Sequence, residues 1–144
     1  MPIALEAEGL WKCYAAGVRG CSARVWVLRG ATLSVAEGER VGVIGARGAG
    51  KTTLLHCLRG LRRTEAGVIR VAPEARAELL LLDEGDGVAE LMGNGARTVI
   101  VAARTADDLH GIVDRCLLLC EGTLLPIRPP TRARRVAEER LGGC

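Results

Sequence analysis

The chain has 144 residues, with 20 basic and 17 acidic side chains and a formal net charge of +3. A chain of this length forms one domain with a core of its own. The slight excess of positive charge does not indicate a nucleic-acid partner, and no apolar run is long enough to span a membrane. The N-terminus also lacks a charged region followed by a long apolar one, so we expect a cytoplasmic protein.

The N-terminal part has the pattern of an antiparallel sheet. Residues 3–8 alternate apolar and polar side chains, residues 24–28 form a second apolar run, and residues 32–35 alternate again. Glu37 and Gly38 then predict a turn. Aromatic residues make up 2% of the chain and Phe is absent, so the core must be built from Leu, Val, Ile and Ala.

From residue 41 onward, strands alternate with helices, which predicts a parallel sheet. Residues 41–44 read as a buried strand, and residues 67–71 as a short strand ending before Pro73. The four leucines at 79–82 predict a central parallel strand, because they would bury both of its faces. The first helix is predicted from leucines at helical spacing, namely Leu54, Leu55, Leu58 and Leu61.

The same alternation continues to residue 127. We expect a short helix at residues 88–92, an apolar strand at 98–102 and another strand at 116–120. Thr105 and Asp108 resemble a capping box that would start a further helix. The apolar face of that helix would consist of Leu109, Ile112 and Val113. A turn at Glu121 and Gly122 then leads into residues 123–127.

Residues 45–52 match every fixed position of the pattern G-x-x-x-x-G-K-[S/T], which is a phosphate-binding loop. Glycines let successive backbone N–H groups turn inward around an anion, and the following helix directs its positive end at the same point. Lys51 would reach the β- and γ-phosphates, and the Thr52 hydroxyl would bind Mg²⁺. The phosphate-contacting residues are Gly45, Ala46, Arg47, Gly48, Ala49, Gly50, Lys51, Thr52 and Thr53.

Asp83 and Glu84 follow the leucine strand directly. They therefore lie at the carboxyl edge of a parallel sheet, where the phosphate loop also opens. In this arrangement, called Walker B, Asp83 would hold Mg²⁺ and Glu84 would polarise the water that attacks the γ-phosphate. The alternative is a strand that runs into an acidic surface turn.

Other polar and sulfur-containing residues give weaker signals. The six cysteines contain no C-x-x-C pair and read as buried free thiols. Cys116 and Cys120 would lie on one face of a strand, but no paired metal ligands are near them in sequence. His56 and His110 read as surface or packed helix residues.

Taken together, these motifs resemble the ATP-binding subunit of ABC transporters from residue 3 to about residue 127. Tyr14 stands where that family has an adenine-stacking aromatic residue, and residues 45–53 match its phosphate loop. Further matches occur at residues 27–30, 37–39, 60–61, 67–69, 80–84, 114–115 and 121–122.

Three departures from the family pattern affect the expected function. Asp83 follows Lys51 by 83 − 51 = 32 positions, an interval that in the family also holds a helical subdomain with the Q-loop and the L-S-G-G-Q signature. The chain contains no Gln, and its Gly-Gly pair lies at residues 142–143. Arg104 stands at the place of the family's switch histidine, and Ala89 with Glu90 replaces Leu-Asp of the D-loop.

The resemblance implies a P-loop NTPase sandwich of the α/β class, with a mainly parallel sheet flanked by helices and an antiparallel N-terminal part. Residues 1–127 would form a minimal nucleotide-binding domain, and residues 128–144 an arginine-rich tail. The implied ligands are ATP or ADP with Mg²⁺, bound by the phosphate loop, Tyr14, Arg104 and Asp83, with Glu84 as the catalytic residue. No nucleic acid is expected to bind.

Three functions remain open at this point. The chain could be an ATPase component whose missing signature comes from a partner ABC ATPase, acting with a membrane permease. It could also be a regulatory or assembly module that binds nucleotide without hydrolysing it. The third alternative is a decayed remnant. In each case any membrane association would be made through a partner.

Overall fold

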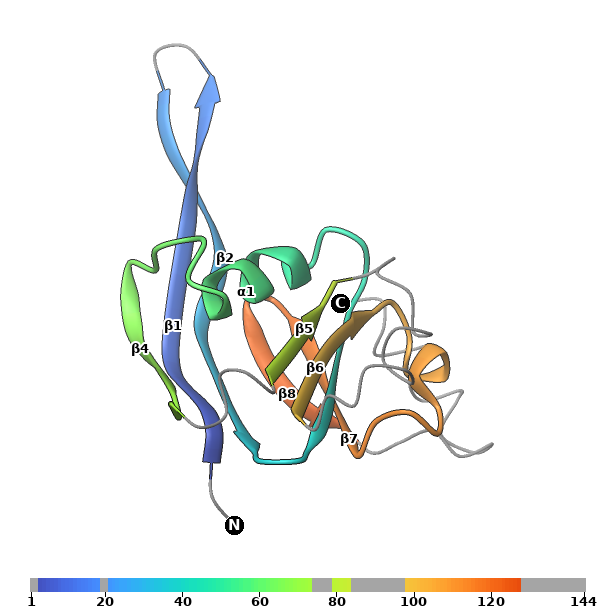
Figure 1. The fold of residues 1–144 in the computed structure, drawn as a ribbon. Coiled ribbons are helices and arrows are strands. Elements are labelled where there is room, and N and C mark those ends of the chain that lie inside the picture. The colour runs from blue at the N-terminus through green and yellow to red at the C-terminus, as the bar shows by residue number, and fades with distance from the viewer. Residues whose placement is uncertain (1–2, 19–20, 74–78, 84–97, 128–144) are drawn as a thin grey trace.

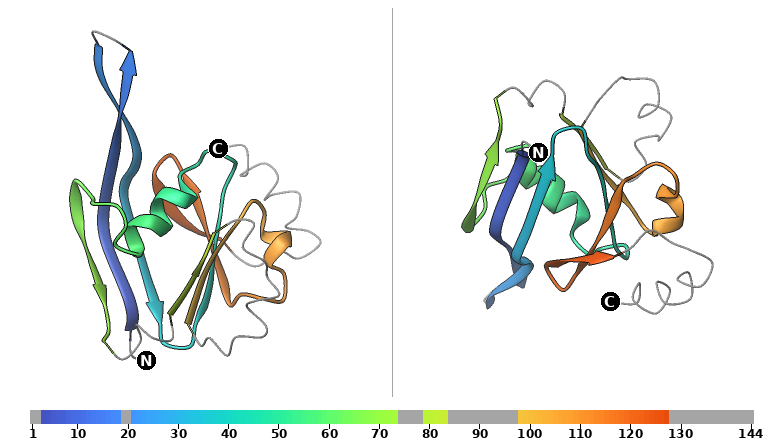
Figure 2. Two further views of the ribbon diagram at one scale, coloured as in Figure 1. Left: turned by 45° about the horizontal axis from the view of Figure 1, so that its top comes forward. Right: turned by 90° about the horizontal axis from the view of Figure 1, so that it is seen from below.

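Two β-sheets with one α-helix between them form the part of the chain that the computed structural model describes, which is residues 3–18, 21–73, 79–83 and 98–127 (Figures 1 and 2). The elements in chain order are β1 Ile3–Val18, β2 Cys21–Ala36, β3 Arg40–Ile44, α1 Lys51–Leu58, β4 Ala66–Val71, β5 Leu79–Leu82, β6 Thr98–Ala103, the 3-10 helix η1 Ala106–Leu109, β7 Arg115–Cys120 and β8 Thr123–Ile127. The helix expected at residues 88–92 and the tail at 128–144 lie outside the described residues.

The first sheet is antiparallel, as the N-terminal pattern predicts, with strand order β2-β1-β4. β1 and β2 form a long hairpin that projects beyond the rest of the molecule (Figure 1). The strands are longer than predicted, because β1 continues past residue 8 to Val18 and β2 begins at Cys21, before the apolar run at residues 24–28.

The second sheet has the order β5-β6-β3-β7-β8, in which the first four strands are parallel and β8 is antiparallel to β7. β3 lies at its centre, where Val41 pairs with Ile100 of β6 and with Arg115 of β7. The prediction of a central strand at residues 79–82 is wrong for the described part of the chain. There β5 pairs only with β6, and of its leucines Leu82 alone is buried.

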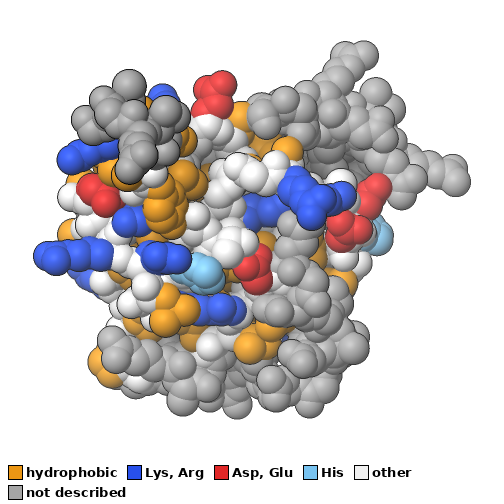
Figure 3. Space-filling view, turned by 90° about the horizontal axis from the view of Figure 1, so that it is seen from above, with side chains coloured by type: hydrophobic (Ala, Val, Ile, Leu, Met, Phe, Trp, Pro, Cys, Tyr) orange, Lys and Arg blue, Asp and Glu red, His pale blue; other side chains and the backbone are white. Residues whose placement is uncertain are grey.

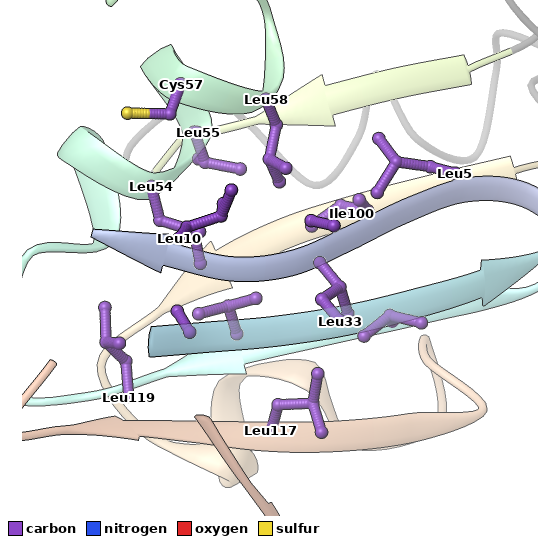
Figure 4. Packing of buried hydrophobic residues seen from close by; sticks show 14 of the residues in the cluster. Leu5, Leu10, Leu33, Leu54, Leu55, Cys57, Leu58, Ile100, Leu117 and Leu119 are labelled. Atoms are coloured by element: carbon purple, nitrogen blue, oxygen red, sulfur yellow. The ribbon is translucent and has the colours of Figure 1, made fainter. Parts of the chain in front are cut away.

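The two faces of the second sheet carry separate hydrophobic cores. On one face, Val41 and Val43 of β3 pack with leucines from the antiparallel sheet and from α1 (Figure 4). On the other face, Ile44 packs with alternate residues of β6 and β7 and with Leu109 of η1. The apolar runs of β3 and β6 are therefore explained by burial on both sides, as parallel strands require.

The helix α1 is shorter than its leucine pattern suggests. Gly60 adopts a positive φ of 80°, its N–H donates to the Cys57 carbonyl, and the Leu61 N–H donates to the His56 carbonyl. These two bonds form a Schellman motif, which ends the helix. Leu61 therefore lies beyond it and is 67% exposed, so its predicted place on the buried helix face is wrong.

The capping box predicted at Thr105 is also wrong. The Thr105 side chain makes no capping hydrogen bond, and the segment forms only the short 3-10 helix η1. Leu109 is nevertheless buried, and Ile112 and Val113 pack against the same core cluster, as the apolar pattern predicts. Leu109 also lies so close beneath Gly42 that a Cβ there would approach its Cδ1 to 2.5 Å.

An ion pair and a backbone hydrogen bond hold the start of β3 beside the start of β7. The Arg115 guanidinium binds both carboxylate oxygens of Glu39, at 2.9 and 3.2 Å. The Asp114 carboxylate accepts a hydrogen bond from the Arg40 N–H at 2.8 Å. These contacts give a structural role to two of the sequence matches, residues 37–39 and 114–115, at the end of the sheet opposite the phosphate loop.

Candidate functional site

The segment from Gly45 to Gly50 joins the end of β3 to the start of α1, as the phosphate-loop pattern predicts. Gly48 and Gly50 have positive φ angles of 84° and 104°. L-residues with a side chain rarely adopt this conformation, so the loop requires glycine at both positions. A turn closed by the Ala49 N–H and the Ala46 carbonyl, at 3.0 Å, gives the loop its curvature.

Close packing requires glycine at the two ends of the loop. A Cβ on Gly45 would lie 2.9 Å from the Leu119 carbonyl oxygen of β7. A Cβ on Gly50 would lie 2.6 Å from Val27 Cγ1 of β2. The loop is therefore seated against one strand of each sheet, which fixes its position relative to the core.

The start of α1 is suited to an anion. Gly50 is the N-cap residue and provides no side-chain hydrogen bond to the helix. The N–H groups of a first helical turn have no carbonyl partner within the helix, and the helix dipole is positive at that end. A phosphate placed at this point would accept hydrogen bonds from the backbone.

Lys51 is buried, with 4% of its surface exposed. Its Nζ donates hydrogen bonds to the carbonyl oxygen of Gly45 and, at 3.5 Å, to that of Ala46. The loop thus holds an ammonium group on its inner side, and burial without such partners would be costly. The Lys51 ammonium group therefore lies within the loop that would surround a phosphate.

An open pocket of about 580 Å³ lies beside the loop and brings together residues from four parts of the chain. Asp83 follows β5 and Arg104 follows β6, so the carboxyl ends of adjacent parallel strands meet the loop at one edge of the sheet. The lining consists of Val27, Arg47, Gly48, Gly50, Lys51, Thr52, Thr53, Asp83 and Arg104.

The charge around this pocket is mainly positive. Arg47, Lys51 and Arg104 contribute cations, and Asp83 contributes a carboxylate. Basic side chains elsewhere on the face seen from above lie in several separate places, among acidic and apolar ones (Figure 3). The charge of the pocket therefore suits a compact polyanion such as a polyphosphate.

Tyr14 lies next to this pocket without lining it. Its hydroxyl is 3.4 Å from the Thr53 hydroxyl, and Thr53 belongs both to α1 and to the pocket wall. The structure thus brings Tyr14 to the phosphate-loop region, although 39 positions separate it from Thr53. Glu84, the predicted catalytic residue, lies outside the described residues.

Val27, Lys12 and Glu65 were not identified from the sequence as part of this region. Val27 lines the pocket, and Lys12 lies over the Tyr14 ring with its Nζ 5.2 Å from the ring centroid. Glu65 binds Lys12 at 3.3 Å. Val27 lies in an apolar run that gives no sign of a site, and the Lys12–Glu65 contact joins residues 53 positions apart.

Cys13, Cys57, Cys116 and Cys120 are free thiols. Burial raises the pKa of the Cys57 thiol above its usual value, so it is protonated at neutral pH. Cys116 and Cys120 both pack in the core behind the second sheet. Within the described ranges, no group of three or more His, Cys, Asp and Glu side chains could hold a metal ion.

The family model for ABC transporters matches residues 28–80, which include the phosphate loop and α1. The lipoprotein-releasing system ATP-binding protein LolD of Chromohalobacter salexigens is 46% identical over 77 residues, covering 54% of this chain and 31% of that protein. LolD of Xanthomonas oryzae is 48% identical over 75 residues, covering 52% of this chain and 29% of that protein. Residues 28–80 of the chain are therefore similar in sequence to ATP-binding proteins of ABC transporters.

Solved structures of low sequence identity share the fold of this chain. A chain of a metal-chelate type ABC transporter in an inward-facing conformation matches with a TM-score of 0.69 and 17% identity, covering 97% of this chain and 90% of that one. An ATP-binding cassette of an ABC transporter in its ADP conformation matches with a TM-score of 0.68 and 12% identity, covering 89% and 92%. The predicted α/β P-loop class is therefore confirmed.

The chain spans about a third of the length of the curated relatives it matches. Between α1 and β5, the described residues hold β4 as their one regular element. No helix in the described ranges is long and apolar enough to cross a membrane.

Proposed function

We propose that the chain binds ATP and ADP, with Mg²⁺, at residues 45–53. The observation that carries this proposal is the pocket in which the phosphate loop, Asp83 and Arg104 meet. The loop amides and Lys51 would bind the β- and γ-phosphates, and Arg104 would add a further cation near the γ-phosphate. An arginine at this position cannot exchange a proton as a histidine does.

The residues at the pocket suit Mg²⁺, which prefers oxygen ligands. The Thr52 hydroxyl and the Asp83 carboxylate both belong to the pocket wall and would hold the ion. When bound, Mg²⁺ neutralises the charge that develops between the β- and γ-phosphates. We propose Glu84, the residue after Asp83, as the general base for the attacking water, and Tyr14 as the platform for the adenine ring.

We further propose that residues 1–127 act as a minimal nucleotide-binding domain and that residues 128–144 form a tail. The domain would work in the cytoplasm as the ATP-binding component of a transporter, reaching the membrane through a permease and receiving a signature motif from a second ABC ATPase. Its similarity to LolD proteins supports this assignment.

The second candidate is a module that binds nucleotide for regulation or assembly and scarcely hydrolyses it. It is favoured by the short interval from Lys51 to Asp83, in which Asp83 follows by 32 positions and which leaves no room for the subdomain that carries the signature. The intact Lys51, Thr52 and Asp83 disfavour a decayed remnant, because a chain without nucleotide binding has no need to keep them together.

Titration calorimetry of Mg-ATP and Mg-ADP tests the binding proposal. In Lys51→Ala the affinity for both nucleotides should fall by at least about ten-fold, since the phosphates lose a buried cationic partner. Arg63→Ala is a matched control, because Arg63 is an exposed cation outside the pocket wall. Equal affinities in wild type and Lys51→Ala would remove the phosphate-loop assignment.

A further inference from the structure

The aromatic ring of Tyr14 has a cation over one of its faces. Lys12 lies two residues earlier on β1, and its Nζ is 5.2 Å from the ring centroid. The Lys12 side chain as a whole is 12% exposed. A cation placed in this way is attracted by the ring and restricts how the ring can move.

Glu65 holds Lys12 in this position. One carboxylate oxygen lies 3.3 Å from Lys12 Nζ, and the other accepts a hydrogen bond from the Cys13 N–H at 2.9 Å. The Glu65 N–H donates to the Trp11 carbonyl at 2.8 Å. Glu65 therefore contacts three consecutive residues of β1 just before Tyr14, and we call this set of contacts the Glu65–Lys12 clamp.

The charge state of Glu65 suits this role. The Cys13 N–H, and after it the Lys12 ammonium, hold the pKa of the Glu65 carboxyl below its usual value. Glu65 is therefore ionised at neutral pH. At the opposite end of Tyr14, its hydroxyl lies 3.4 Å from the hydroxyl of Thr53.

We infer that Glu65 and Lys12 are positioning residues for the nucleotide base: they hold the Tyr14 ring with one face covered by the Lys12 ammonium, so that an aromatic base stacks on the other face. This inference rests on the proposed nucleotide function. A ring held in place before binding loses less conformational freedom when the base stacks on it, which raises the affinity. The clamp acts only on ligands that have a base.

The test compares three ligands by titration calorimetry with excess Mg²⁺: ATP, ADP and inorganic triphosphate. Glu65→Gln and Lys12→Met each remove one charge of the clamp and keep the length of the side chain. Both variants should lower the affinity for ATP and ADP by about three- to five-fold and change the affinity for triphosphate by less than about two-fold. Lys12→Arg keeps the cation and should retain nearly all of the wild-type ATP affinity.

Glu8→Gln is the matched control. Glu8 is also on β1 and forms an ion pair, with Arg70 of β4 at 3.7 Å, but it has no contact with Tyr14. It should bind all three ligands as the wild type does. An effect of Glu8→Gln as large as that of Glu65→Gln would mean that any lost charge on this strand has the same consequence, which contradicts the clamp.

Other outcomes would overturn the inference in distinguishable ways. An equal loss of affinity for all three ligands would mean that the clamp stabilises the fold and does not position the ring for the base. Tighter ATP binding in Lys12→Met would mean that Lys12 occupies the face that the base needs. If the wild type binds triphosphate as tightly as ATP, the base adds nothing to the affinity, so the clamp inference is wrong while the proposed phosphate site is retained. If the wild type binds neither ligand, the proposed nucleotide-binding function is wrong as well.

Discussion

Gly48 and Gly50 of the phosphate loop have similar backbone conformations but different surroundings. Their φ angles are 84° and 104°, so an alanine is strained at either position. A Cβ on Gly50 would meet Val27 Cγ1 at 2.6 Å, whereas a Cβ on Gly48 would find no heavy atom within 4 Å. The pair therefore separates backbone strain from steric conflict.

We predict that Gly50→Ala lowers the free energy of unfolding by about 2–4 kcal/mol, because it combines backbone strain with overpacking. Gly48→Ala should cost about 1 kcal/mol, since only the strain applies. Urea unfolding in the absence of nucleotide measures both values. Equal losses in the two variants would mean that Val27 moves aside freely and does not fix the loop.

Glu65 gives a prediction on pH dependence. Its pKa is lowered in the folded protein, mainly by the Cys13 N–H, so the folded state binds its proton less tightly than the unfolded state does. The resulting stabilisation is fully present above the unfolded pKa, about 4.3, and is lost as the pH falls through the folded pKa. Wild type should therefore lose its advantage over Glu65→Gln below about pH 4.

Urea unfolding of both proteins at several pH values between about 3 and 8 checks this expectation. The difference in unfolding free energy between them should be constant near neutral pH and should shrink in acid. The control is Glu8→Gln, whose carboxylate is more exposed and pairs with Arg70. A difference that grows in acid would contradict the hydrogen-bonded, ionised carboxylate.

At the scale of elements, α1 connects the phosphate loop to the main core. Leu54 of α1 is fully buried among residues of both sheets, whereas Leu61 lies beyond the end of the helix and is 67% exposed. We predict that Leu54→Ala lowers the free energy of unfolding by about 2–5 kcal/mol and Leu61→Ala by less than about 0.5 kcal/mol. Similar losses, measured by urea unfolding, would place Leu61 in the core and contradict the helix end at Gly60.

Much of the element order could be predicted from the sequence, because apolar runs and turn residues carry local information. The strands at residues 41–44, 98–102 and 116–120 were expected from such runs, and the structure contains them. Leu61 fits the helical spacing, but two backbone hydrogen bonds at Gly60 end the helix before it. Leu79–Leu82 has the composition of a central strand, while its edge position depends on pairing with distant residues.

The phosphate loop and Asp83 were predictable at the scale of the whole molecule, since both follow strands that end at one edge of a parallel sheet. Arg104 was expected at this edge because it stands where the ABC family has its switch histidine, and it lines the same pocket. The contacts of Lys12 with Glu65 and of Tyr14 with Thr53 could not be predicted in this way. They join the antiparallel sheet to other segments through side chains far apart in sequence.

In the proposed function, this chain binds ATP in a site that two of its copies cannot complete. Phosphoryl transfer depends almost entirely on positioning and charge neutralisation. In the ABC family a signature motif from a second subunit closes over the γ-phosphate, and this sequence has no such motif between Lys51 and Asp83. A group supplied in trans, such as an arginine finger, is worth about 10³-fold or more in rate.

Phosphate release from Mg-ATP, measured per chain over a range of protein concentrations, tests this claim most directly. We predict a very slow rate that stays flat as concentration rises and increases only when a signature-bearing ABC ATPase subunit is added. Lys51→Ala should abolish that increase. A rate of about 1–10 s⁻¹ from the chain alone, typical of complete enzymes, would contradict an incomplete site and mean that Arg104 or another local group completes it.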